Sequence, residues 1–322
     1  MRKPRKNCLR IAYAKEKGRW KMKIGNTPLV RLKNTETAYG LSSALYAKDE
    51  SKNAGGSIKD RVALAILDQA EKEGKIQNGG TVVEATSGNT GIGLALVAKS
   101  RGYKTIIVMP DTMSEERREL IKKYGGEIEL TDGKKGMQGA VERANEIVKN
   151  TPNSTLADQF NNPACVAAHY EGTGKEIWLQ TNGTADIFVA AVGTGGTLTG
   201  VGKYLKEQKA TLQVVAVEPE NSPLLSKGKA GAHAIQGIGA NFIPSILDRE
   251  IYDEVLTVTE DEAFAMAKFL RKEENLFVGI SAGANVAAAI KLAQRKESVG
   301  KTIVTILPDD GGRYVSIAKF NE

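Results

Sequence analysis

The chain has 322 residues, 41% of them hydrophobic, which is enough for two domains with separate cores. No apolar run approaches the ~20 residues of a membrane-spanning helix, and no signal-peptide core follows the basic N-terminus. The formal net charge is +7, but residues 1–23 hold ten of the 45 Lys and Arg and only one of the 38 acids. The 35 basic and 37 acidic residues that remain exclude a basic nucleic-acid binder, and we expect no membrane partner either.

Residues 1–23 form a basic N-terminal extension with three interpretations. The segment is a solvated tail, an organelle-targeting segment poor in acids, or sequence upstream of a natural start at Met22. Its lack of serine weakens the targeting interpretation. With only Cys8, Cys165 and two histidines, the chain shows neither a disulfide framework nor the Cys-x-x-Cys or His-Glu-x-x-His spacing of a zinc site. We therefore expect no metal and a cytoplasmic location, with organelle targeting left open.

Strands and helices alternate along the rest of the chain. A turn at residues 24–32 enters a short strand, a second strand covers 44–48, and a helix runs from Lys59 to near Gly74. The first alternating series predicts strands at 81–85, 105–109 and 127–130 and helices at 92–100, 115–124 and 137–149. After a polar, proline-containing break at 150–163, the second series predicts strands at 186–192, 213–218, 276–279 and 302–307, with helices at 170–180, 198–208, 260–272 and 284–295. Apolar strands that alternate with helices indicate right-handed βαβ units and mostly parallel sheets.

The stretch Asn53–Arg61 presents Lys59 at the start of a helix. Ser57-x-x-Asp60 predicts a capping box, in which Ser57 accepts from the Asp60 amide and the Asp60 carboxylate reaches back. In the first turn, the positive end of the helix dipole opposes an ammonium charge and favours the neutral amine. A neutral, partly buried lysine amine attacks aldehydes, although a surface lysine after a capped turn is the alternative for this stretch alone.

Two glycine-containing loops each lie between a predicted strand and a predicted helix. In Thr86–Gly91, hydroxyls, an amide side chain and free N–H groups converge as in an anion pocket suited to a carboxylate, with an ordinary N-capping turn as the alternative. In Gly193–Thr197, glycines and two threonines can wrap a phosphate, unless the glycines only permit tight packing. Ser281 precedes another predicted helix, where its hydroxyl faces a ligand or caps the helix.

The sequence fits neither of two common nucleotide-binding motifs. The dinucleotide pattern Gly-x-Gly-x-x-Gly fails because Leu198 stands at the third glycine position of the Gly193 loop. A Walker loop ending at Lys301 fails because Arg295 stands at its leading glycine position. A ligand with an aldehyde for Lys59 and a phosphate for Gly193–Thr197 is pyridoxal phosphate, and the carboxylate pocket then implies an amino-acid substrate.

These motifs resemble those of the pyridoxal-phosphate enzymes of the cysteine synthase (O-acetylserine sulfhydrylase) and cystathionine β-synthase family. The resemblance covers residues 24–322 and is specific at Ile24–Leu32, at Gly56–Arg61, at both loops and at the stretch 222–244. It implies fold type II, similar to the tryptophan synthase β subunit: two open, twisted, mostly parallel α/β sheets with a cofactor cleft between them. The expected division is a smaller mobile domain of residues 46–163 and a larger cofactor-binding domain of residues 24–45 and 164–322.

The resemblance also implies roles for individual residues. Lys59 would be the Schiff-base lysine and the α-proton base, Asn89 would partner the 3′-oxygen of the cofactor, and Ser281 would face its ring nitrogen. The phosphate would lie on the loop residues Gly193, Thr194, Gly195, Gly196 and Thr197. The substrate would be held by Thr86, Ser87, Asn89, Thr90, Gln159 and Gly237.

The implied reaction is β-replacement, in which O-acetyl-L-serine and sulfide give L-cysteine and acetate. Cystathionine β-synthase chemistry with homocysteine is the nearest alternative, because Asn53–Gly56 is closer to that enzyme and Gly312 replaces the usual glutamate of cysteine synthases. Against it, no regulatory module follows residue 322. The family also implies a homodimer and docking of a serine acetyltransferase C-terminal tail, so a mainly regulatory protein is a third possibility.

Overall fold

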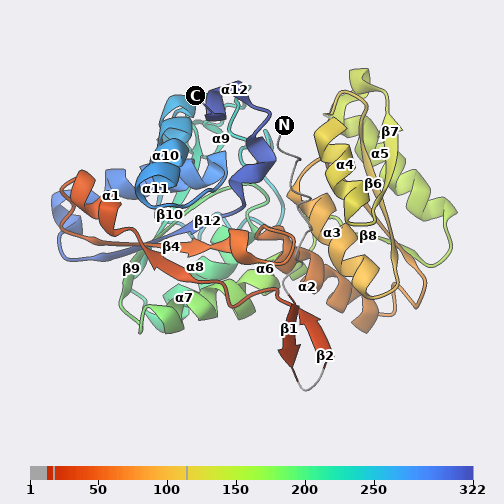
Figure 1. Ribbon diagram of the computed structural model, residues 1–322, viewed down its shortest axis with the longest axis horizontal. Coiled ribbons are helices and arrows are strands. Elements are labelled where there is room, and N and C mark those ends of the chain that lie inside the picture. Colours follow the sequence, from red (N-terminus) through yellow and green to blue (C-terminus); the bar gives the residue numbers. More distant parts are fainter. Residues whose placement is uncertain (1–12, 17–18, 114, 322) are drawn as a thin grey trace, which may run out of the picture.

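Two sheets, each flanked by helices, form the two halves of the molecule in a computed structural model that describes residues 13–16, 19–113 and 115–321 (Figure 1). The larger sheet has the order β11-β10-β9-β12-β4-β3, and only β3 runs antiparallel to its neighbour. Its strands are β3 (Leu29–Arg31), β4 (Ala44–Asp49), β9 (Ala185–Ala191), β10 (Gln213–Pro219), β11 (Glu254–Val258) and β12 (Thr302–Leu307). The smaller sheet is entirely parallel, with the order β7-β6-β5-β8. Its strands are β5 (Thr81–Ala85), β6 (Lys104–Pro110), β7 (Glu127–Thr131) and β8 (Ser154–Leu156).

Helices cover both faces of each sheet, because parallel strands joined by crossovers are apolar on both sides. Around the smaller sheet these are α2 (Lys59–Lys72), α3 (Asn89–Ser100), α4 (Glu115–Lys123) and α5 (Gly136–Asn150). Around the larger sheet they are α1 (Lys33–Ala38), α6 (Ala164–Ala168), α7 (Lys175–Gln180), α8 (Gly196–Gln208), α9 (Leu224–Lys227), α10 (Glu260–Glu273), α11 (Ile280–Ala293) and α12 (Ala318–Asn321). The largest apolar core joins the larger sheet to α10 and α11, and a second joins its other face to α8.

The predicted α/β class with two mostly parallel sheets is confirmed, and several details of the prediction are wrong. Residues 276–279 do not form a strand, since Val278 makes only an isolated bridge to Asp310 before α11 begins. The short strands β8 and β11 were missed, although β11 (Glu254–Val258) carries the apolar and β-branched residues typical of a strand. The helix expected at 170–180 starts earlier, as α6, and passes through a π-helical segment at His169–Gly174 before α7.

The expected domain boundary at residue 46 lies within β4, all of which belongs to the larger sheet. The break at 150–163 contains β8, which pairs with β5 of the smaller sheet. The division into a smaller mobile domain and a larger one stays a proposal, with its first boundary moved beyond β4.

The described part of the N-terminal extension is a hairpin of β1 (Tyr13–Glu16) and β2 (Arg19–Met22), which projects from the body (Figure 1). Residues 1–12, including Cys8, lie outside the described residues. Met22 packs against the core beside the smaller sheet. None of the helices in the described ranges is long and apolar enough to cross a membrane.

Candidate active site

A cleft of about 1310 Å³ lies between the two halves, at the carboxyl ends of β5, β9 and β12. This is where open parallel sheets place their ligands, because the loops that follow neighbouring strands meet there. Twelve of the thirteen site residues expected from the sequence line it: Lys59, Thr86, Ser87, Asn89, Thr90, Gln159, Gly193, Thr194, Gly195, Thr197, Gly237 and Ser281. The remaining one, Gly196, starts α8 behind the loop and packs against the carbonyl of Cys165.

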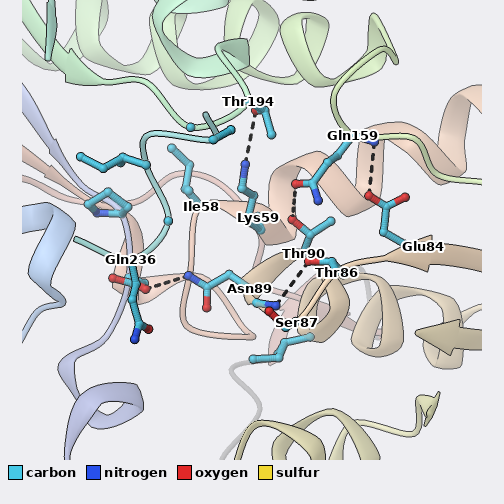
Figure 2. A pocket seen from close by; sticks show the side chains of 18 of the residues that line it. Ile58, Lys59, Glu84, Thr86, Ser87, Asn89, Thr90, Gln159, Thr194 and Gln236 are labelled. Carbon is cyan, nitrogen blue, oxygen red and sulfur yellow. Dashed lines mark hydrogen bonds between the residues drawn. The ribbon is translucent and has the colours of Figure 1, made fainter. Parts of the chain in front are cut away.

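Lys59 is the first residue of α2, and its side chain extends into the cleft toward the Gly193–Thr197 loop (Figure 2). Its Nζ lies 3.5 Å from the Thr194 hydroxyl oxygen. Burial lowers the pKa of the Lys59 amine, because removing water from around the group disfavours the ammonium form. The direction of the shift agrees with the sequence-based expectation, and the structure provides a nucleophilic amine close to a polar loop.

The capping box expected before Lys59 is absent. The Ser57 hydroxyl accepts from the Lys59 N–H at 3.3 Å instead of from the Asp60 N–H, because Ile58 occupies the N-cap position. The Asp60 carboxylate accepts from the Gly55 N–H at 2.5 Å and is fully buried, which raises its pKa to about 7. Asp60 therefore ties the glycine turn to the helix start.

The Gly193–Thr197 loop forms a cradle of free N–H groups at the start of α8. The backbone N–H groups of residues 194–198 donate to no acceptor among the described residues. Gly195 has φ +87°, and a Cβ there would come within 2.7 Å of Leu247. A Cβ at Gly193 would come within 2.4 Å of the Gly237 carbonyl oxygen. A helix N-terminus of this kind binds anions through its N–H groups and its dipole.

The second loop, Thr86–Gly91, lies opposite the cradle and is not an ordinary side-chain cap. The N-cap residue of α3 is Gly88, with no side-chain capping bond. The Thr86 hydroxyl oxygen accepts from the Gly88 N–H at 3.3 Å, which leaves the Thr86 O–H for the cleft. The Thr90 hydroxyl donates to Oε1 of Gln159 at 2.6 Å, which leaves the Gln159 amide N–H groups free (Figure 2). This arrangement of hydroxyl and amide donors suits a carboxylate.

Glu84 holds the loop after β8, which carries Gln159, and it was missed in the sequence. Its carboxylate accepts from the N–H groups of Asp158 at 2.8 Å and Gln159 at 3.4 Å. Burial raises the pKa of Glu84 to about 7, and the two N–H donors oppose that shift. Its position inside an apolar strand, where a charged residue is unusual, was a signal that could have identified it.

Asp309 and Arg313 also line the cleft and were missed. The Asn89 amide nitrogen donates to Asp309 Oδ2 at 2.7 Å, and Arg313 donates to the Asn89 amide oxygen. Asp309 follows β12, at the same edge of the larger sheet as the Gly193–Thr197 loop after β9, so the rule that found that loop could have found Asp309.

Ser281 is the second residue of α11, whose N-cap is Gly279, so the capping alternative for its hydroxyl is wrong. Ser281 is largely buried but lines the cleft, and its hydroxyl makes no hydrogen bond within the described ranges. This hydroxyl can therefore donate to, or accept from, a ligand in the cleft.

Comparison with known proteins places the chain in a family. The profile of the family described as "Pyridoxal-phosphate dependent enzyme" matches residues 21–309. The chain belongs to this family. A cysteine synthase from Staphylococcus aureus strain Mu50 is 49% identical over 294 residues, which are 91% of this chain and 94% of that protein.

Solved structures of other pyridoxal-phosphate dependent enzymes share the fold. A cysteine synthase from Entamoeba histolytica has a TM-score of 0.89 and 41% identity, and the match covers 100% of this chain and 94% of that one. An O-ureido-L-serine synthase has a TM-score of 0.88 and 43% identity, with 92% and 93% of the two chains covered.

The cleft fits the cofactor of a pyridoxal-phosphate dependent enzyme on three observations of its own. The glycine cradle suits a phosphate, because the backbone N–H groups of residues 194–198 donate to no acceptor among the described residues. Lys59 supplies an amine of lowered pKa for the aldehyde, and Ser281 supplies an unpartnered hydroxyl for the ring. The pyridoxal phosphate predicted from the sequence is therefore the cofactor of this protein.

Proposed function

We propose that the protein is a cysteine synthase, which converts O-acetyl-L-serine and sulfide into L-cysteine and acetate. The observation that carries the proposal is the Lys59 amine of lowered pKa, 3.5 Å from the phosphate-type loop in a cleft that also holds the carboxylate-type loop. The relatives support it, because proteins named cysteine synthase are similar over most of the chain both in sequence and in fold.

In this proposal the cofactor is held at four points. Lys59 would bond to its aldehyde carbon, Gly193–Thr197 would bind its phosphate, Asn89 would donate to its 3′-oxygen and Ser281 would face its ring nitrogen. When bound, pyridoxal phosphate supplies an electron sink that stabilises negative charge at the substrate α-carbon. Ser281, a serine rather than a carboxylate, would leave the ring nitrogen unprotonated and the electron sink weaker.

The protein's own residues do the remaining work. Thr86, Ser87, Thr90, Gln159 and Gly237 bind and orient the amino-acid substrate, mainly through its carboxylate. Lys59 would take the α-proton of the substrate on Nζ, and a lowered pKa favours the neutral form of Nζ that can accept a proton.

A second candidate is condensation with homocysteine in place of sulfide. Gly312 lines the cleft at the position where cysteine synthases usually carry glutamate. The missing side chain leaves room and removes a negative charge, both of which favour a larger acceptor that carries its own carboxylate.

We also propose that the protein is a cytoplasmic homodimer and that a serine acetyltransferase C-terminal tail docks in the same cleft. Family membership supports both interactions, and the buried free thiol of Cys165 fits a reducing compartment. Light scattering tests the dimer, and competition between a tail peptide and O-acetylserine tests the docking.

The test of function joins a chemical trap to steady-state assays. Borohydride treatment of the protein with pyridoxal phosphate is expected to fix the cofactor on Lys59, as read by peptide mass spectrometry, and Lys59→Ala is expected to show no such adduct. Turnover of O-acetylserine is then compared with sulfide and with homocysteine as acceptor. A covalent adduct retained in Lys59→Ala, or absence of turnover with both acceptors, would sink the proposal.

A further inference from the structure

Asp309 is a buried acid in the cleft to which the proposed reaction gives no role. It is 1% exposed, and its Oδ2 accepts from Asn89 at 2.7 Å and from the Tyr314 hydroxyl at 2.5 Å. Its Oδ1 has no hydrogen-bond partner within the described ranges and lies against Gly279, where a Cβ would come within 2.1 Å of it. Gly279 therefore makes room for this carboxylate at the start of α11.

The carboxamide of Asn89 is held at both ends by charged groups. Its nitrogen donates to Asp309 and its oxygen accepts from Arg313. Because a carboxylate only accepts and a guanidinium only donates, these two partners fix which end of the amide is nitrogen. The amide oxygen is thereby occupied, and one N–H remains for the cleft. Asn89 can act toward a ligand only as a donor.

We propose that Asp309 and Arg313 are positioning residues that hold Asn89 as a hydrogen-bond donor toward an anionic oxygen of the bound ligand. The inference rests on the proposed function, in which that oxygen is the 3′-oxygen of pyridoxal phosphate. A freely rotating carboxamide also presents its oxygen, which repels an anionic oxygen. The charged clamp removes that orientation before the ligand arrives, so binding costs less ordering.

The clamp also joins the two halves of the molecule at the site. Asn89 starts α3 beside the smaller sheet, whereas Asp309 and Arg313 follow β12 of the larger sheet. The orientation of Asn89 is therefore set by the half of the molecule that carries the Gly193–Thr197 cradle. The Asn89 contact and the phosphate contact to one ligand thus keep a fixed position relative to each other.

A double-mutant cycle on cofactor affinity tests the clamp without measuring turnover. The dissociation constant of pyridoxal phosphate is measured by titration of the apoprotein in the parent, Asp309→Ala, Asn89→Ala and the double variant. We expect Asp309→Ala to weaken binding about tenfold when Asn89 is present, and less than about twofold when it is absent. Asp310→Asn is the matched control, because this neighbouring acid accepts from the Gly312 N–H and does not touch Asn89. Its affinity should equal that of the parent.

The outcomes separate the clamp from a merely structural role. Equal weakening in both backgrounds, or no weakening in either, overturns the inference while the proposed function stands. A parent apoprotein that fails to bind pyridoxal phosphate overturns both. Thermal unfolding of each apoprotein checks folding, and if Asp309→Ala does not fold, Asp309→Asn takes its place in the cycle. That variant keeps an acceptor oxygen and loses the charge, so we expect a severalfold weakening only when Asn89 is present.

Discussion

Gly195 shows how a single backbone position controls the phosphate-type loop. Its φ of +87° lies in the left-handed region, and Leu247 stands 2.7 Å from where a Cβ would be. The sequence indicated that glycines in Gly193–Thr197 let the backbone approach a ligand. Gly195 has no space for a side chain because of Leu247, which reaches the loop from a distant part of the chain.

We expect Gly195→Ala to lose about 1–3 kcal/mol of unfolding free energy from overpacking, and to weaken pyridoxal phosphate binding about tenfold or more as the N–H cradle shifts. Gly40→Ala is the control, since Gly40 has φ +59° with nothing within 4 Å and so carries the backbone strain alone. Urea unfolding and cofactor titration measure the two effects. Equal stability losses in both variants, with cofactor affinity unchanged, would contradict the prediction.

At the scale of elements, a buried ion cluster fixes the start of α2. It consists of Lys48 on β4, Glu50, Arg61 on α2 and Glu176 on α7. Arg61 Nε lies 2.7 Å from Glu50, Arg61 Nη1 lies 2.7 Å from Glu176, and Lys48 Nζ lies 2.7 Å from the other Glu176 oxygen. Because Lys59 precedes Arg61 by half a turn, the cluster holds the lysine backbone against the larger sheet.

The cluster makes stability depend on pH in the acid range. Burial by itself would raise the pKa of Glu176, but Arg61 and Lys48 lower it to about 2 from 4.5. A lowered folded-state pKa gives stability that is fully present above pH 4.5 and is lost as the pH falls toward 2.

We expect Glu176→Gln to be about 3 kcal/mol less stable than the parent at pH 7, with the difference shrinking as the pH falls toward 2. Urea unfolding at several pH values between 7 and 2 measures this difference. Glu73→Gln is the control, because Glu73 pairs with Lys75 on the surface, and its stability should follow the parent at every pH. If the unfolding free energies of the parent and Glu176→Gln change in parallel with pH, the ion cluster is not the source of the pH dependence.

At the scale of the whole molecule, the cleft joins residues from both halves, and we propose that residues near 86–160 move as a unit when the substrate binds. Gln159 and the Thr86–Gly91 loop lie on different segments of the sequence, so the sequence predicts that they bind a carboxylate together only if the cleft closes around it. The structure shows them already in contact at 2.6 Å, because β5 and β8 are neighbours and the loops after them lie side by side. We therefore propose that closure moves Thr90 and Gln159 together relative to the Gly193–Thr197 loop.

We expect Gln159→Ala to leave cofactor affinity unchanged and to slow acetate release from O-acetylserine roughly ten- to a hundredfold, the value of one charge-assisted hydrogen bond of ~1.5–3 kcal/mol. Rapid-quench measurement of acetate under single-turnover conditions isolates this step. Gln77→Ala, on an exposed loop of the same half, should release acetate at the parental rate. Parental acetate release in Gln159→Ala would show that Gln159 only holds its own loop.

The sequence by itself determined the alternation of strands and helices, the positions of Lys59 and of the two loops, and the α/β class, because these depend on local periodicity and on glycine and hydroxyl chemistry that neighbouring residues display. Only the tertiary structure decided that 276–279 is not a strand, that Ser57 does not cap α2, and that Asp309 and Arg313 hold Asn89. Each of these features depends on partners far along the chain. A strand needs a neighbour for its hydrogen bonds, and a buried carboxylate needs donors brought to it by other elements, so local pattern alone does not specify them.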